Sequence, residues 1–169
     1  VPGAGGATIS GGVVPSGNIR RYQPDKQNGG DKMTTQTTER PTCKDRVGSA
    51  LQGRMEDIEH LIQAARDGVE DVPDLGNIND YGLSFDYVAP GTFNGQRRGY
   101  FRWQLSWGGP AEEFRFFCDE TMTPLRIEFW FLDWFDGAKR ILRGKARETL
   151  MDWFDDLNGC GVVRAEYER

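Results

Sequence analysis

The sequence predicts a two-layer α+β domain in which an antiparallel sheet of four or five strands packs against two helices. Three observations lead to this fold class. Apolar residues recur every three or four positions over residues 47–65, alternate at every second position over residues 81–132, and return to helical spacing over residues 145–157. A sheet with one apolar face and two helices with single apolar stripes can bury each other's apolar surfaces.

The first helix is predicted to begin after Thr42. Thr42 and Asp45 have the spacing of an N-cap and an acidic residue at the third helical position, and Gly68 supplies the stop. His60, the single histidine, lies opposite the apolar stripe, which is typical of a surface residue. The stripe consists of Val47, Leu51, Met55, Ile58, Leu61, Ile62 and Ala65.

Alternating large residues predict four strands joined by a long loop and short turns, which favours an antiparallel meander. The strands cover residues 81–88, 100–107, 113–118 and 125–132. The apolar face is expected to hold Phe101, Trp103, Leu105, Trp107, Phe114, Phe116, Cys118, Leu125, Ile127, Phe129 and Phe131. The second helix is predicted over residues 145–157, and residues 161–167 are a candidate fifth strand at the sheet edge.

The first 32 residues differ in composition from the rest of the chain. They are rich in Gly, Pro, Ser and Asn without periodicity, so residues 1–32 are either a disordered tail or an untranslated leader. The leader hypothesis rests on Val1, which a GUG codon encodes, and on residues 29–33, whose codons can form a ribosome-binding sequence before a start codon. Residues 33–41 are then a flexible N-terminus, and residues 42–169 form a single domain.

Composition narrows the classes of protein that the chain can belong to. The formal net charge of −5 becomes −7 without residues 1–32, because that segment holds four basic and two acidic residues. No stretch approaches the roughly 18 consecutive apolar residues of a membrane span, and no secretion signal is recognisable. The sequence therefore favours a cytoplasmic protein without a membrane partner.

The sequence lacks the residues that a metal site or a catalytic site needs. One histidine and three cysteines without a pairing pattern predict reduced thiols, no metal site, no cofactor and no catalytic residue. Cys43, close to the predicted start of the first helix, is expected to have a lowered thiol pKa.

The string YFRWQLSWGGPAEEFRFF, followed by LRIEFWFLDWFDGA, resembles a group of small, mostly uncharacterised proteins encoded by bacteria, their plasmids and their phages. The resemblance spans residues 81–154. It implies an accessory protein of a mobile element, and it carries no activity or catalytic residue with it.

Six acidic residues form the first candidate site, an acidic surface for a basic-surfaced protein partner: Asp133, Asp136, Glu148, Asp152, Asp155 and Asp156. Glu148, Asp152 and Asp156 follow one another four residues apart, where like charges repel, and the last acids oppose the helix dipole. Such a surface is either an ordinary solvated face or a docking site that imitates a phosphate backbone. In its sharpest form, this hypothesis describes a non-enzymatic inhibitor that occupies the basic cleft of a host restriction or CRISPR nuclease.

The second candidate site is the outer face of the sheet, where Tyr100, Arg102, Arg115, Arg126 and Trp130 combine rings with cations. This mixture is typical of single-stranded nucleic-acid binding. The acidic balance of the chain opposes non-specific binding, and cross-strand ion pairs to Glu113 and Glu128 explain the arginines equally well. A small enzyme without an assigned reaction is the third hypothesis. The oligomeric state is open, and joint exposure of Trp130, Trp134 and Trp153 would indicate a dimer.

Overall fold

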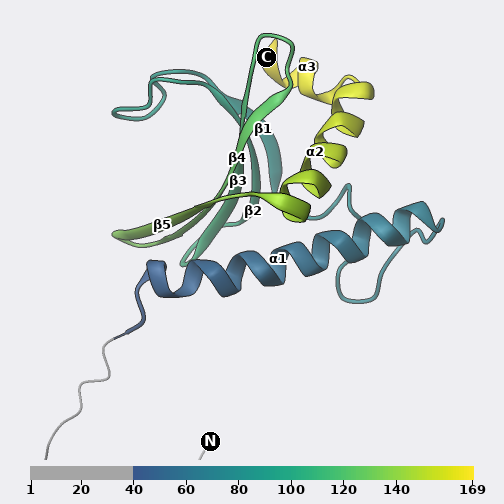
Figure 1. Cartoon of the computed structure of the whole chain (residues 1–169), viewed down its shortest axis with the longest axis horizontal. Helices are drawn as coiled ribbons and strands as arrows, with labels where there is room; N and C mark the ends of the chain where they lie inside the picture. Colours follow the sequence, from purple (N-terminus) through teal and green to yellow (C-terminus); the bar gives the residue numbers. More distant parts are fainter. Residues whose placement is uncertain (1–39) are drawn as a thin grey trace, which may run out of the picture. The chain divides into compact units, whose positions relative to one another are not determined.

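Residues 40–169 are described by a computed structural model, in which an antiparallel five-stranded sheet packs against helices (Figure 1). The α+β fold class predicted from the sequence is confirmed. The proposed leader or tail, residues 1–32, lies outside the described residues, as does most of the segment 33–41.

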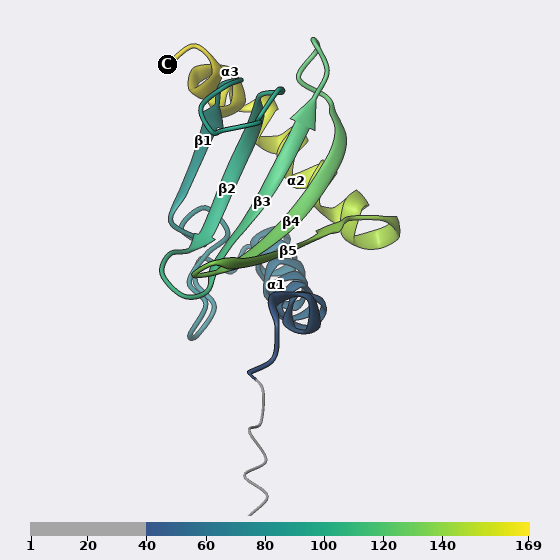
Figure 2. The same ribbon diagram turned by 90° about the vertical axis from the view of Figure 1, so that its left-hand side faces the viewer.

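The strands follow one another through the sheet in the order β1-β2-β3-β4-β5, and each pairs antiparallel with the next. Figure 2 shows the two C-terminal helices behind the sheet and the N-terminal helix below it. All helices of the described residues contribute to the core on one face of a simple meander. The elements are α1 (Cys43–Arg66), β1 (Ser84–Val88), β2 (Tyr100–Ser106), β3 (Ala111–Cys118), β4 (Pro124–Asp133), β5 (Asp136–Ile141), α2 (Gly144–Gly159) and α3 (Val162–Tyr167).

The start of α1 is the one that the sequence predicted. The Thr42 side chain accepts from the backbone N–H of Asp45, and the Asp45 carboxylate accepts from the backbone N–H of Thr42 at 3.0 Å. This capping box satisfies two backbone donors of the chain at the first turn. The helix ends at Arg66, and Gly68 takes a positive φ of 73° just beyond it.

The fifth strand is not where the sequence analysis placed it. Residues 161–167 contain the helix α3, in which Val163 is fully buried and Tyr167 packs edge-on against Tyr87 with ring centroids 4.8 Å apart. The fifth strand is β5, which pairs with β4 through a two-residue hairpin loop. Nearly every residue of β5 is exposed, so the strand shows no apolar alternation, and only its backbone pairing defines it.

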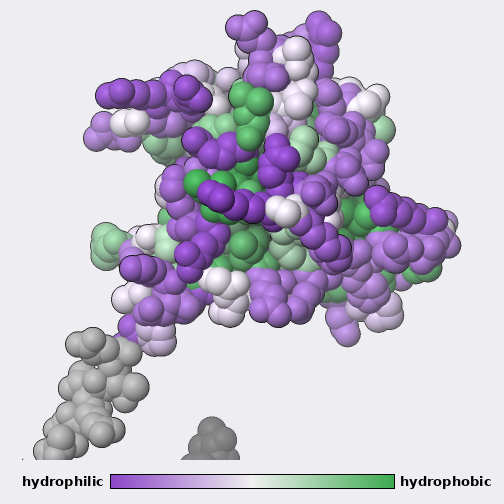
Figure 3. All heavy atoms as spheres, viewed as in Figure 1, coloured by the Kyte–Doolittle hydropathy of each residue, from purple (hydrophilic) through white to green (hydrophobic). Residues whose placement is uncertain are grey.

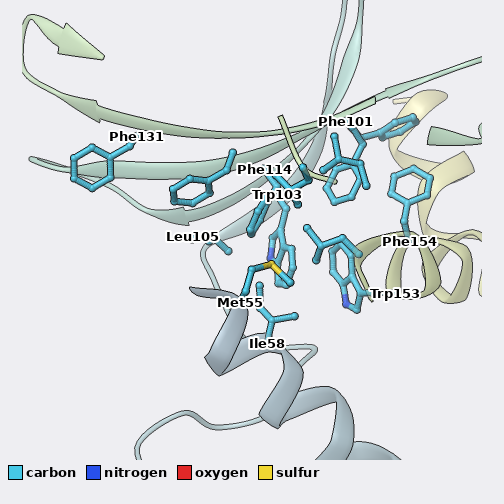
Figure 4. Close-up of a cluster of buried hydrophobic side chains, with 14 of the residues drawn as sticks. Met55, Ile58, Phe101, Trp103, Leu105, Phe114, Phe131, Trp153 and Phe154 are labelled. Atoms are coloured by element: carbon cyan, nitrogen blue, oxygen red, sulfur yellow. The ribbon is translucent and has the colours of Figure 1, made fainter. Parts of the chain in front are cut away.

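The core lies between the sheet and the helices (Figure 4). Trp103 of β2 stacks on Trp153 of α2 with centroids 3.9 Å apart, and Phe116 stacks on Phe154 at 4.9 Å. From the other side α1 adds Met55 to the same cluster. The buried residues of the inner sheet face are Phe101, Trp103, Leu105, Phe114, Phe116, Ile127, Phe129 and Phe131, all of which the alternation predicted.

Two residues expected on the inner face are exposed instead. Trp107 lies just after the end of β2 with 78% of its surface exposed, and Leu125 is 64% exposed. The register shifts between Phe117 and Cys118, so that Leu125 has no partner across the ladder. Such an irregularity interrupts the strict alternation of a strand.

Within residues 40–169, none of the helices has the combination of length and apolar sequence that a membrane span needs.

We expect Phe154→Ala to lower the free energy of unfolding by about 3–5 kcal/mol, because the ring is fully buried and its loss leaves a cavity. Urea unfolding monitored by circular dichroism measures the change. The control is Leu125→Ala at an exposed position, which should cost no more than about 0.5 kcal/mol. Equal losses in the two variants would show that the helices do not bury this core.

Candidate functional site

The face of the sheet opposite the helices carries a groove of about 720 Å³. None of the described helices covers this face, as Figure 2 shows. The groove crosses strands β2 to β5 and is bordered by residues 93–98 of the loop between β1 and β2.

All five residues of the predicted outer-face site line this one groove: Tyr100, Arg102, Arg115, Arg126 and Trp130. Residues that the sequence analysis did not assign to the site line it as well. These are Phe93, Arg97 and Arg98 from the loop, Trp107 at the end of β2, and Lys139 from β5. The basic run RRGYFR at residues 97–102 was a usable signal for the two loop arginines, since it leads directly into β2.

The lining of the groove is basic although the chain is acidic. Its six basic side chains are Arg97, Arg98, Arg102, Arg115, Arg126 and Lys139, against the two acidic residues Glu113 and Glu128. Both acids are buried, with 6% and 2% of their surfaces exposed. The charge that a ligand meets in the groove is therefore mainly positive.

Ion pairs account for most of these cations. Arg115 binds Glu113 at 2.5 Å, while Arg126 and Lys139 approach Glu128 at 3.1 and 3.0 Å. The Arg102 guanidinium binds both oxygens of Asp86 on β1, at 3.0 and 2.6 Å, and this contact holds the pKa of Arg102 above its ordinary value. Ion pairs of this kind were the competing explanation in the sequence analysis, and they are present.

Rings and cations also stack across the strands. The guanidinium of Arg115 lies 3.9 Å from the ring centroid of Trp130 and 4.8 Å from that of Tyr100. Arg126 lies 4.2 Å from the ring centroid of Phe117. Cation–π contacts of this kind stabilise the outer layer where no helix shields it. The layer is thus part of the fold as well as of the candidate site.

Arg97 and Arg98 differ from the other cations, since neither has an ion-pair partner among residues 40–169. They lie in a loop that holds its own shape. The side-chain amide of Gln96 donates to the carbonyls of Ala89 and Arg98, and its oxygen accepts from the backbone N–H of Phe93. Two unpaired guanidinium groups are thereby presented at one end of the groove.

The hydroxyl of Tyr100 is a buried polar group without a partner. Tyr100 lines the groove with only 2% of its surface exposed, and its hydroxyl makes no hydrogen bond with the described residues. Burial raises the pKa of this hydroxyl, so it stays protonated and can donate. An unpaired buried donor costs free energy, so we expect this hydroxyl to destabilise the fold.

The six acidic residues of the first candidate site do not form one surface. Asp133 is 8% exposed, and its carboxylate binds Arg46 at 2.6 Å and Arg40 at 3.7 Å. Asp136 accepts a 2.6 Å hydrogen bond from the backbone N–H of Cys43 and so lies at the start of α1. Figure 1 shows that the loop end of the β4–β5 hairpin, where both residues lie, is remote from α2. The exposed acids of α2 are Glu148, Asp152, Asp155 and Asp156.

Cysteine and metal chemistry find no support in this part of the chain. The expected lowering of the Cys43 pKa is wrong: burial raises it, and the neighbouring Asp136 carboxylate disfavours the thiolate further. Burial also raises the pKa of Cys118 to about 12. All three cysteines are free, as predicted. Within residues 40–169 no His, Cys, Asp and Glu side chains group in a way that could hold a metal ion.

No family model, no curated protein and no solved structure matches the chain. A functional proposal for this protein therefore rests on the geometry of its structure.

Asp136 provides a pH-dependent test of the α1 start. The hydrogen bond from Cys43 holds the pKa of Asp136 below its ordinary value of 3.8, so the carboxylate stabilises the fold above that pH. Its contribution is lost as the pH falls through the lower pKa of the folded state. We expect Asp136→Asn to lower the melting temperature at neutral pH, with a difference from the parent that shrinks below pH 3.8. A difference that stays the same from neutral to acidic pH would contradict this role.

Tyr100→Phe should raise the free energy of unfolding by about 1 kcal/mol, because it removes an unpaired buried hydroxyl while keeping the ring. Urea unfolding again measures the change. The matched control is Tyr81→Phe, since the Tyr81 hydroxyl donates to Asp57 at 2.8 Å and accepts from Arg54 at 3.0 Å. That variant should lose about 1–2 kcal/mol. If both variants lose stability equally, Tyr100 has a partner that the described residues do not reveal.

Proposed function

We propose that this protein binds single-stranded nucleic acid in the groove on the open face of its sheet. One observation carries the proposal: an uncovered sheet face combines a groove of about 720 Å³ with exposed positive charge and aromatic rings. Proteins that bind single strands use this combination, because the cations attract phosphates and the rings stack on unpaired bases.

The groove contains groups suited to both parts of a nucleotide. Arg97 and Arg98 have no ion-pair partner among residues 40–169, so their guanidinium groups can bind phosphates without breaking an ion pair of the fold. Phe93 and Trp107 are 51% and 78% exposed and offer free ring surface to bases.

A single strand suits this site better than a duplex. Five aromatic residues contribute to the lining of the groove, and stacking on them requires bases that are not already paired. Arg102 and Arg115 are held in place by their ion pairs with acidic residues of the sheet. They therefore shape the groove, but they add less to its affinity for a ligand than the unpaired arginines of the loop.

The distribution of charge favours one orientation of binding. The exposed acids of α2 lie on the helical side of the sheet, whereas the cations lie on the open side. A polyanion is repelled from the first side and attracted to the second. With a net charge of −5, we expect modest affinity and a strong dependence on salt.

The acidic-surface hypothesis remains a second candidate. One observation favours it: Glu148, Asp152, Asp155 and Asp156 are exposed, and none has an ion-pair partner among the described residues. The surface predicted from six acidic residues is therefore reduced to these four. A basic protein, such as a defence nuclease of the host, is the partner that such a surface would suit. The two functions use opposite sides of the sheet, so variants of one leave the other intact.

The double substitution Arg97→Ala with Arg98→Ala should weaken binding of a labelled single-stranded oligonucleotide about tenfold or more at low salt. The slope of log affinity against log salt should fall in magnitude by about 1.4, since each phosphate contact to a single strand contributes about 0.7. Fluorescence anisotropy over a series of salt concentrations measures both quantities.

The control for this experiment is Arg140→Ala with Arg143→Ala, which removes the same charge from exposed positions outside the groove. It should change the affinity by less than about twofold. Equal weakening by the two double variants would mean that only the overall charge matters, and it would count against a site in the groove.

A further inference from the structure

Three exposed rings gather at the end of the sheet where β2 ends and β5 begins. Trp107 is 78% exposed, Trp134 is 82% exposed, and Phe135 is fully exposed. Trp107 belongs to the turn between β2 and β3, and the other two form the loop of the β4–β5 hairpin. We call these three residues the aromatic tip.

The two turns of the aromatic tip touch each other. A Cβ atom placed on Gly109 of the β2–β3 turn would lie 3.1 Å from Nε1 of Trp134, so the indole covers this glycine. Figures 1 and 2 both show the two turns side by side. Figure 3 shows apolar atoms projecting from a largely hydrophilic surface at this hairpin. The tip is therefore one surface built from two turns.

The hairpin loop contains residue types that two-residue turns rarely use. Trp134 has a φ of 56°, in the left-handed region that two-residue hairpins normally fill with Gly, Asn or Asp. A bulky residue there carries backbone strain, and exposed rings leave apolar surface in water. Strain and exposure at the same residue point to a contact made with another molecule.

The aromatic tip continues the groove. Trp107 lines the groove and also belongs to the tip, whereas Arg97 and Arg98 lie at the other end of β2. A second groove of about 850 Å³ begins at those arginines, and its lining contains Arg126 as well as Asp119 and Glu120. The exposed rings of the tip offer stacking surface to a strand that is longer than the first groove.

A cation is also available beside the tip. The Arg40 side chain is 76% exposed and lies 3.7 Å from Asp133, the residue immediately before Trp134. It can bind a phosphate that passes over the hairpin. Continuity with a basic groove and a neighbouring guanidinium favour bases of the same strand over an apolar protein partner as the occupant of the tip.

We infer that the ligand is a single strand longer than the groove, and that its bases beyond Trp107 stack on Trp134 and Phe135. This inference rests on the proposed function and adds to it the direction and the length of the bound strand. It assigns the loop arginines to one end of the site and the aromatic tip to the other.

The test compares a tetranucleotide with a single strand of about twelve nucleotides, a length within the known range of such sites. The parent chain and the double variant Trp134→Ala with Phe135→Ala are titrated with both by fluorescence anisotropy. We expect the tip variant to bind the longer strand at least about fivefold more weakly, because two stacking contacts are lost. Its affinity for the tetranucleotide should match that of the parent, since the groove itself is intact.

The control variant is Val69→Ala with Leu83→Ala, which trims two exposed apolar residues away from the groove and the tip. It should bind both strands like the parent, and melting curves of all variants establish that they fold. Equal affinity of parent and tip variant for the longer strand would overturn the inference, as would equal loss for both lengths. If the parent binds neither strand at low salt, the proposed function itself fails.

Discussion

The segregation of large rings onto one face of the sheet is the constraint on which the rest of the structure depends. Trp103 stacks on Trp153, and Phe116 stacks on Phe154, so α2 can pack only on this face. Helix α1 adds Met55 to the same cluster, and α3 adds Val163. Because every described helix is used to bury one face, the other face of the sheet has to be stable in contact with water.

The open face meets that requirement with charges rather than with a covering layer. Buried Glu113 and Glu128 are paired with Arg115, Arg126 and Lys139, and the guanidinium of Arg115 stacks on Trp130. A buried carboxylate is tolerated only when it is paired and hydrogen-bonded, so these arginines and the lysine are needed by the fold itself. The same residues line the groove, so a substitution that tests the proposed binding also affects the stability of this face.

Several side chains of the open face and of the tip have groups with no interaction partner among the described residues. Arg97 and Arg98 lack ion-pair partners among residues 40–169, Tyr100 has an unpaired hydroxyl, and Trp134 combines a left-handed backbone with an exposed ring. Together they lie along one path from the loop before β2 to the tip of the sheet, which is the path proposed for a single-stranded ligand.

The sequence by itself determined whatever depends on neighbours along the chain. The capping box of Thr42 and Asp45, the helical stripe of α1, and the alternation that buries one sheet face all follow from local spacing, and alternation also placed Tyr100, Arg102 and Trp130 on a common face. Only the tertiary structure decided what depends on proximity in space. It made a strand of β5 through backbone pairing, placed Asp136 at the start of α1 instead of beside the acids of α2, and raised the pKa of Cys43 by burial. It also brought the turns that carry Trp107 and Trp134 into contact. Alternate turns of a meander lie at the same end of the sheet, and no local pattern encodes which side chains meet there.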